Sequence, residues 1–223
     1  MVNEHEKPCL SWLLNRSKLA MFRYNHNEHY ADLLLRHVPS DCQNALDIGC
    51  GDGGFARRLA DRFGIAVTGI DPNRAMIERA QAETFNPRVQ FVEADFMHYD
   101  FADRFDFITA MASLHHMPFE PALEKITSLL RPGGVLAVLG VFREASVADV
   151  GIALVASPVN VFYALSRGWS SSGAPTRPAD MSLREIHKSV SSHLSDACLR
   201  RLLLWRYFLT WQKPQEQAVF SKS

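Results

Sequence analysis

The chain has 223 residues, 47% of them hydrophobic, and its 24 basic residues balance 24 acidic ones, so its formal net charge is zero. This length suits one domain with elaborations and allows a sizeable core. The charge balance argues against a nucleic-acid partner, because proteins that bind phosphates normally carry an excess or a stripe of basic residues.

Neither a leader nor a membrane span is predicted. Residues 1–14 carry two Glu and a Pro and lack a long apolar stretch, so we expect no signal peptide. No run reaches the roughly 18 apolar residues that a span needs. The nearest, residues 150–165, contains Pro158, and we interpret it as a buried or cleft-lining helix pair. The four cysteines form no CxxC pair, which favours free thiols in a reduced cytoplasm.

Strand-like and helix-like segments alternate along the chain. Residues 11–39 predict one or two helices that end at Pro39. The strands that we expect after them are residues 44–49, 65–71, 88–95, 104–112 and 135–142. The helices that we expect between these strands are residues 53–64, 72–84 and 120–134, the last of them ended by Pro-Gly-Gly. Such alternation predicts a parallel sheet covered on both faces, with ligands at the carboxyl ends of the strands.

The pattern changes beyond residue 142. Residues 167–181 predict a loop rich in Ser, Gly and Pro. Residues 182–194 predict an amphipathic helix, with Ser182 as N-cap and Glu185 completing a capping box. We interpret residues 197–213 as the last two strands with arginines on their solvent side, although a helix starting near Cys198 is an alternative.

The segment ALDIGCGDGG, residues 45–54, carries the ligand-binding signal. Gly49, Gly51 and Gly54 match GxGxxG, which alone is weak support for NAD or FAD. Asp47 stands directly before the turn and Asp52 within it, where they would repel the pyrophosphate that a dinucleotide brings to a helix N-terminus. These carboxylates favour a ligand with a cationic end.

Two further acids end the next two predicted strands. Asp71, in GIDPN, suits the ribose hydroxyls of either cofactor type. Asp95, in EADF, can accept a hydrogen bond from an adenine amino group while the following backbone N–H meets the ring. The two positions predict an adenosine lying across the second and third strands, with its other end over the first turn.

In order and spacing, LDIGCGDGGF, GIDPN, EADF, FDFITAMASLHHM and LLRPGGVLAV resemble the motifs of class I S-adenosylmethionine-dependent methyltransferases, in the style of the small-molecule branch. The resemblance covers about residues 45–141. It implies a Rossmann-like, seven-stranded, mostly parallel α/β sheet with helices on both faces and an N-terminal helical lid. It also divides one domain into a cap (1–40), a cofactor-binding core (41–142), a substrate-side insert (143–180) and a C-terminal helix with the last strands (181–213).

The resemblance also implies cofactor contacts, with S-adenosylmethionine as donor and S-adenosylhomocysteine as product. Asp71 would hold the ribose, with Pro72 beside the adenine, and Asp95 and Phe96 would hold the adenine edge. The residues assigned to the methionine end are Asp47, Gly49, Cys50, Gly51, Ala110 and Met111. Of these, the side chain of Cys50 is expected to pack beneath the loop. Gly53 and Gly54 have an alternative role in helix–strand packing.

Methyl transfer from a sulfonium mainly requires alignment of the reactants and exclusion of water. A base matters only for a hydroxyl or carbon-acid acceptor. His115 and His116 follow the fourth strand, where the resemblance puts the substrate wall, and either is a candidate base, although one of them could instead cap the next helix. Adjacent histidines do not converge easily on one ion, so we expect no metal.

The acceptor is predicted to be a small organic molecule. Tyr24, His26, Asn27 and Tyr30 lie on a probable N-terminal helix that in similar enzymes closes over the donor, although a solvated helix face with core tyrosines is the simpler interpretation. Together with the insert they would form a partly apolar cleft. The alternatives are a nucleic-acid or protein methyltransferase and a non-catalytic cofactor-binding regulator. The protein is expected to be a monomer or homodimer.

Overall fold

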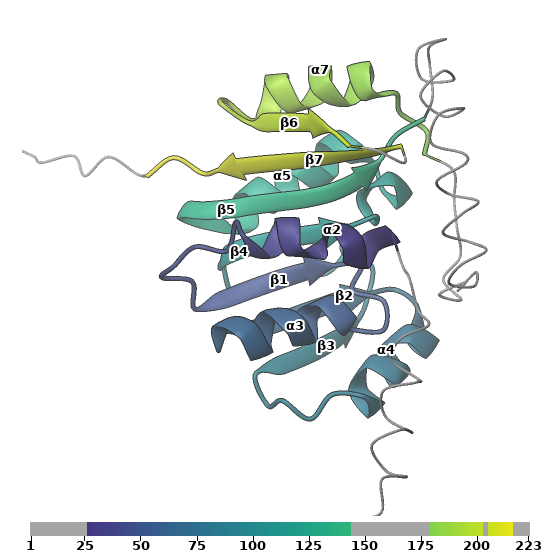
Figure 1. Cartoon of the computed structure of the whole chain (residues 1–223), viewed down its shortest axis with the longest axis vertical. Helices are drawn as coiled ribbons and strands as arrows, with labels where there is room; N and C mark the ends of the chain where they lie inside the picture. The colour runs from purple at the N-terminus through teal and green to yellow at the C-terminus, as the bar shows by residue number, and fades with distance from the viewer. Residues whose placement is uncertain (1–25, 144–178, 203–204, 216–223) are drawn as a thin grey trace, which may run out of the picture.

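The structure is a computed structural model, which describes residues 26–143, 179–202 and 205–215 (Figure 1). The predictions for Tyr24, for residues 150–165 and for most of the loop at 167–181 lie outside the described residues. For His26 and Asn27, the backbone is described but not the side chains.

One sheet organises the described part of the chain, and its seven strands run in the order β3-β2-β1-β4-β5-β7-β6. The strands are β1 (Asn44–Ile48), β2 (Ala66–Asp71), β3 (Val89–Glu93), β4 (Phe105–Met111), β5 (Leu130–Val141), β6 (Cys198–Arg201) and β7 (Arg206–Gln212). Strands β1 to β5 are parallel, and β7 runs antiparallel between β5 and β6. This topology confirms the predicted Rossmann-like fold. Strand order reverses between β1 and β4, so the carboxyl ends of these two strands flank the place where such folds bind ligands.

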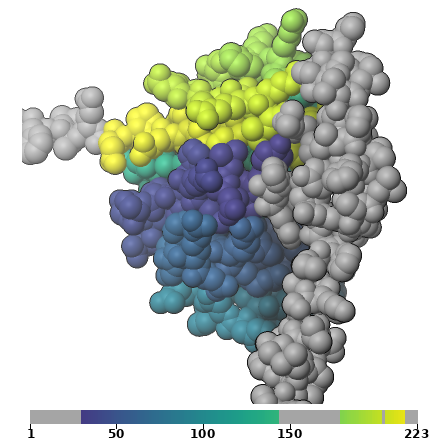
Figure 2. All heavy atoms as spheres, viewed as in Figure 1, coloured from purple at the N-terminus to yellow at the C-terminus, as the bar shows by residue number. Residues whose placement is uncertain are grey.

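Helices cover both faces of the sheet. Those described are α2 (His26–Leu35), α3 (Gly54–Phe63), α4 (Arg74–Ala82), α5 (Phe119–Leu129) and α7 (Leu183–His193), together with the short 3-10 helix η1 (Leu114–His116). Helices α2 and α3 share one apolar core with the sheet, and α5 and α7 share another on the opposite face. Figure 2 shows α2 and α3 side by side on the same side of the molecule. None of the described helices is long and apolar enough to cross a membrane.

The apolar pattern explains why these segments pack as they do. In β1, Ala45, Leu46 and Ile48 are fully buried because both faces of a parallel sheet are covered. In α3, the buried residues Phe55 and Leu59 stand four apart and therefore share one helix face. Burying each such side chain contributes about 1.5–3 kcal/mol to folding.

Helix ends differ in how closely they follow the prediction. The capping box of α7 is confirmed, since Ser182 Oγ accepts from Glu185 N at 3.4 Å and Glu185 Oε2 accepts from Ser182 N at 2.7 Å. Helix α4 begins two residues later than predicted, because the Asn73 side chain caps it. The predicted extension of α5 to residue 134 is wrong. Leu130 already pairs with β4, and Gly133, at φ 80°, lies in an irregular part of β5.

The last two strands are confirmed as an antiparallel pair, so the alternative helix at Cys198 does not form. Arg200 and Arg201 are exposed, as predicted. Arg206 is not exposed, so the prediction that its side chain faces solvent was wrong. Two of its guanidinium nitrogens are buried, because β7 is an internal strand covered by α2 on that face.

Candidate functional site

The glycine-rich loop leaves β1 and is tied to the end of β2. The backbone N–H groups of Gly49 and Cys50 both donate to Ile70 O, at 2.8 and 3.1 Å. Gly49 and Gly51 have φ of 69° and 54°, a region that side-chain-bearing residues rarely occupy. A Cβ at Gly51 would meet no atom within 4 Å, so this residue presents bare backbone to open space. A ligand can therefore approach the loop closely at this point.

The other small residues of the loop fill space within the protein. A Cβ at Gly53 would lie 2.4 Å from the Phe91 ring, which supports the packing role considered for this glycine. Cys50 is buried beneath the loop, and its Sγ would stand 2.9 Å from a Cβ at Gly69. Burial raises the pKa of the Cys50 thiol, which therefore stays protonated. A cofactor contact of Cys50 stays a prediction.

Asp47 is the most unusual polar residue of the site. It is 2% exposed, and its Oδ2 has no hydrogen-bond partner among the described residues. Thr109, its register neighbour on β4, is fully buried and its Oγ1 also lacks a partner there. Burial, with a smaller contribution from the negative charge of Asp71, raises the pKa of Asp47 to about 7. A buried carboxyl group without a partner is costly, and a cationic ligand would relieve that cost.

Asp71 joins the loop to the end of β2. Its Oδ2 accepts from Gly51 N at 2.9 Å, and its Oδ1 accepts from Asn73 N at 2.8 Å. A carboxylate offers about four lone-pair sites, so about two remain for a ligand. Asp71 thus shapes the loop and keeps acceptor capacity for hydroxyl groups.

The end of β3 presents Asp95 in the open. Its Oδ1 accepts from Met97 N at 2.8 Å, and its Oδ2 lies 3.1 Å from His98 Nδ1. The Phe96 side chain points the other way, into the core, where the Lys125 ammonium lies 5.4 Å from the centre of its ring. Phe96 can therefore meet a ligand only through its backbone. Pro72 is exposed beyond the end of β2.

The turn after β4 packs directly on the glycine-rich loop. Ala110 is fully buried and Met111 partly exposed, and Ala112 follows at φ 54°, a conformation that is uncommon for alanine. Ser113 comes next, and its Oγ donates to Ile48 O. A Cβ at Gly49 would lie 2.3 Å from Ser113 Cβ, so only glycine fits there. The sequence carries no signal for this contact, because it joins residues 65 positions apart.

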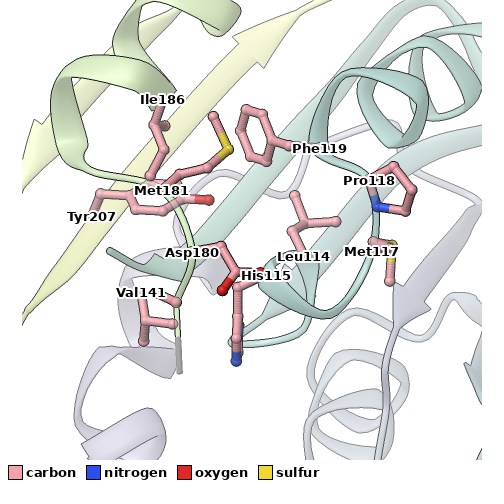
Figure 3. Close-up of a pocket in the computed structure, with 11 residues that line it drawn as sticks. Leu114, His115, Met117, Pro118, Phe119, Val141, Asp180, Met181, Ile186 and Tyr207 are labelled. Carbon is pink, nitrogen blue, oxygen red and sulfur yellow. The ribbon is translucent and has the colours of Figure 1, made fainter. Parts of the chain in front are cut away.

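A cavity of about 220 Å³ lies beside this turn, between η1, the start of α5, the start of α7 and the end of β5 (Figure 3). The residues that line it are Leu114, His115, Met117, Pro118, Phe119, Val141, Ala179, Asp180, Met181, Ile186 and Tyr207. Most of them are apolar. The Tyr207 hydroxyl points into the space that they enclose (Figure 3), and burial raises its pKa, so the group stays neutral. Sequence reasoning missed Tyr207, since it stands in a regular strand with no motif around it.

The two candidate histidines are adjacent but lie in different surroundings. His115 is half-buried and lines the cavity, whereas His116 is exposed. Their ring centroids are 3.9 Å apart. Tyr30, on α2, is half-buried and packs against the core that α2 shares with α3. Within the described residues, no group of three or more His, Cys, Asp and Glu side chains could hold a metal ion.

Comparison with known proteins identifies the family. A family model described as a methyltransferase domain matches residues 45–134. An uncharacterized methyltransferase of Mycobacterium tuberculosis is 35% identical over 195 residues, which is 86% of this chain and 98% of that protein. This chain belongs to the class I S-adenosylmethionine-dependent methyltransferase family.

Other methyltransferases match parts of the chain or its fold. The 27-O-demethylrifamycin SV methyltransferase of Amycolatopsis mediterranei is 40% identical over 99 residues, 42% of this methyltransferase and 36% of that protein. The N-methyltransferase NodS of Bradyrhizobium japonicum, solved with S-adenosyl-l-homocysteine, superposes with a TM-score of 0.58 at 18% identity. That alignment covers 86% of this chain and 89% of NodS, and it shows a shared fold.

Proposed function

We propose that this methyltransferase moves a methyl group from S-adenosylmethionine to a small organic acceptor that occupies the cavity beside η1. The observation that carries the proposal is the buried carboxyl group of Asp47, whose Oδ2 has no partner in the described structure. Its place beside a loop with bare backbone suits a ligand that has both a cationic end and a close contact with the main chain.

The polar groups at three successive strand ends fit the parts of this cofactor in order. Asp47 suits the ammonium of the methionine end, Asp71 the ribose hydroxyls, and Asp95 with the N–H of Phe96 the adenine edge. A dinucleotide fits less well, because its pyrophosphate would stand against the carboxylates of Asp47 and Asp52. This fit supports the sulfonium cofactor independently of sequence similarity.

The cavity supports a small acceptor. Its volume of about 220 Å³ and its mostly apolar lining suit a compact organic group rather than a polymer. The balanced charge of the chain also disfavours a nucleic-acid acceptor. The name of the rifamycin relative, which matches part of the chain, is consistent with a small-molecule acceptor.

The chain's own residues would align the acceptor and exclude water. S-adenosylmethionine, when bound, supplies an already activated methyl group. The hydroxyl of Tyr207 would orient an acceptor inside the apolar cavity. His115, on the cavity wall, would accept the proton of a hydroxyl or carbon-acid acceptor, whereas the exposed His116 is placed less well for that task. An amine or thiol acceptor would need no base. Tyr30 and the undescribed side chains of Tyr24 and His26 remain proposed acceptor contacts.

Two measurements test the proposal. Calorimetry should find S-adenosylhomocysteine binding in the micromolar range, about −8 kcal/mol, and no comparable binding of NAD. Formation of S-adenosylhomocysteine from S-adenosylmethionine, screened over a panel of small hydroxylated, amino and thiol compounds, then tests transfer. Binding of NAD alone would contradict the cofactor assignment, and tight cofactor binding without turnover of any acceptor would instead favour a regulatory binding protein.

A further inference from the structure

Arg206 places a buried positive charge at the acceptor end of the sheet. It is the first residue of β7 and pairs in register with Val141, which lines the cavity. Its Nε and Nη1 are both shielded from solvent and have no hydrogen-bond partner among the described residues. Burial lowers the pKa of this guanidinium, as expected for a charge held out of water. Arginine nonetheless stays protonated in proteins, so the charge itself persists.

No described carboxylate compensates that charge. Side chains alternate along β7, so Tyr207 faces the side of α5 and α7, while Arg206 faces the side of α2. Of the described ionisable groups, the one that supports the charged form of Arg206 electrostatically is the phenol of Tyr30 on α2. A buried cation with unused donors is costly to keep in a folded protein. Such a group is explained when a ligand brings the missing negative charge.

The position of Arg206 favours the acceptor over the cofactor as the source of that charge. The cofactor-binding loop follows β1, and β4 and β5 stand between β1 and β7 in the sheet. With neighbouring strands about 4.8 Å apart, Arg206 lies about 14 Å across the sheet from β1. Val141, opposite Arg206, belongs to the cavity wall. The guanidinium therefore stands away from the cofactor loop, on the α2 face of the sheet, at the strand end where its pairing partner Val141 lines the cavity.

We propose that Arg206 binds an anionic group of the acceptor, a carboxylate or an oxyanion of similar size, so that the substrate is a small apolar molecule with an acidic end. The planar fork of two N–H groups suits bidentate binding of a carboxylate. This inference rests on the proposed function, because it assigns a chemical class to the acceptor of the same site.

The test uses the full chain saturated with S-adenosylhomocysteine and a fixed panel of probes. The probes are benzoate, phenylacetate, hexanoate and octanoate, each paired with its primary amide, and their dissociation constants are measured by calorimetry or thermal shift. In the wild type, at least one carboxylate should bind about tenfold or more tightly than its amide. The variant R206M should lose this preference, and R206K should keep part of it. R200M, at an exposed arginine of the adjacent strand β6, should keep all of it.

A second measurement, the unfolding temperature, shows whether R206M is properly folded. Removing an uncompensated buried charge is neutral or stabilising, so ligand-free R206M should unfold at a temperature no lower than the wild type. A large drop in its unfolding temperature would mean that Arg206 serves the fold, and it would overturn the proposal. So would equal binding of every carboxylate and its amide to the wild type, or an unchanged preference in R206M.

The same variants show whether Arg206 binds a carboxylate of the acceptor or the carboxylate of the cofactor. 5′-Methylthioadenosine lacks the amino-acid end of S-adenosylhomocysteine and serves as the comparison. If R206M weakens binding of S-adenosylhomocysteine about tenfold but leaves methylthioadenosine unchanged, the guanidinium holds the cofactor's own carboxylate, and the acceptor proposal is wrong. Failure of the wild type to bind S-adenosylhomocysteine at all would contradict the proposed function instead, and it is measured before any probe is added.

Discussion

Asp47 should make the stability of the ligand-free protein fall as pH rises. Its pKa is about 7 in the folded protein against an ordinary 3.8, so the unfolded chain releases this proton first. The contribution of Asp47 to folding stability is therefore fully present below about pH 4 and is lost as pH rises toward 7, by up to roughly 4 kcal/mol at about 1.4 kcal/mol per pH unit. D47N should remove this slope, as urea unfolding at about pH 5 and about pH 8 would reveal. D103N, at an exposed carboxylate, is the control. Parallel pH curves for the wild type and D47N would contradict the assignment.

Asp71 offers a separate test of the cofactor site. Under the proposed role of Asp71, D71A removes a carboxylate that would accept from two ribose hydroxyls, so it should weaken S-adenosylhomocysteine binding by roughly 2–3 kcal/mol. The fold should survive D71A because the side chain stands at a partly exposed strand end, although the loop loses its bond to Gly51. Calorimetry measures the affinity and circular dichroism the fold. A folded D71A with wild-type affinity would mean that Asp71 is not the ribose ligand.

The expected effect of replacing His115 depends on the kind of acceptor. For a hydroxyl or carbon-acid acceptor, H115A should lower turnover by about 10²–10⁴ with cofactor affinity unchanged. H116A should have a smaller effect, since His116 is exposed and does not line the cavity. The comparison uses single-turnover rates once an acceptor is found. If H115A turned over a hydroxyl acceptor as fast as the wild type, His115 would not be the base. Alignment of the reactants alone would then account for catalysis.

At the scale of elements, the contact between the glycine-rich loop and the turn after β4 should matter for stability. An alanine at Gly49 meets both an unfavourable φ and the Cβ of Ser113, so G49A should cost roughly 2–5 kcal/mol of unfolding free energy. Gly64 has nearly the same φ at the far end of α3, with no atom within 4 Å of an added Cβ. G64A should therefore cost only about 1–2 kcal/mol and leave cofactor binding intact. Denaturant unfolding measures the loss of unfolding free energy in each variant. Equal losses in G49A and G64A would contradict the proposed steric contact between position 49 and Ser113.

Most elements were predictable because local patterns specify them. Apolar runs and helical periodicity found β1 to β5 and the helices between them, and Ser182 with Glu185 marked the start of α7. The end of α5 was mispredicted because Leu130 pairs with β4, an interaction between segments distant in sequence. Arg206 was misplaced for a similar reason. Alternation in a strand separates two faces, but it does not say whether α2 covers one of them.

At the scale of the whole molecule, the strand order brings the predicted acids to one edge of the sheet. Asp47 and Asp71 lie in the last residues of β1 and β2, and Asp95 follows β3, and these three strands lie side by side, as the motif order implied. The cavity was not predictable in detail. Tyr207 reaches it from the antiparallel strand β7 and Met181 from the segment before α7, so both depend on the complete topology. The positions of the proposed cofactor-binding acids were thus largely predictable from strand ends, and the lining of the cavity was not.

The central claim is that this chain binds S-adenosylmethionine through these strand ends and uses it. The most direct test is calorimetry of the purified full chain with S-adenosylhomocysteine in buffers of different ionisation enthalpy, at a pH below about 7, where Asp47 holds its proton. We expect micromolar affinity and release of about one proton on binding, because the ligand's ammonium favours the ionised form of Asp47. D47N should bind without that release. Absence of binding, or NAD binding in its place, would contradict the account.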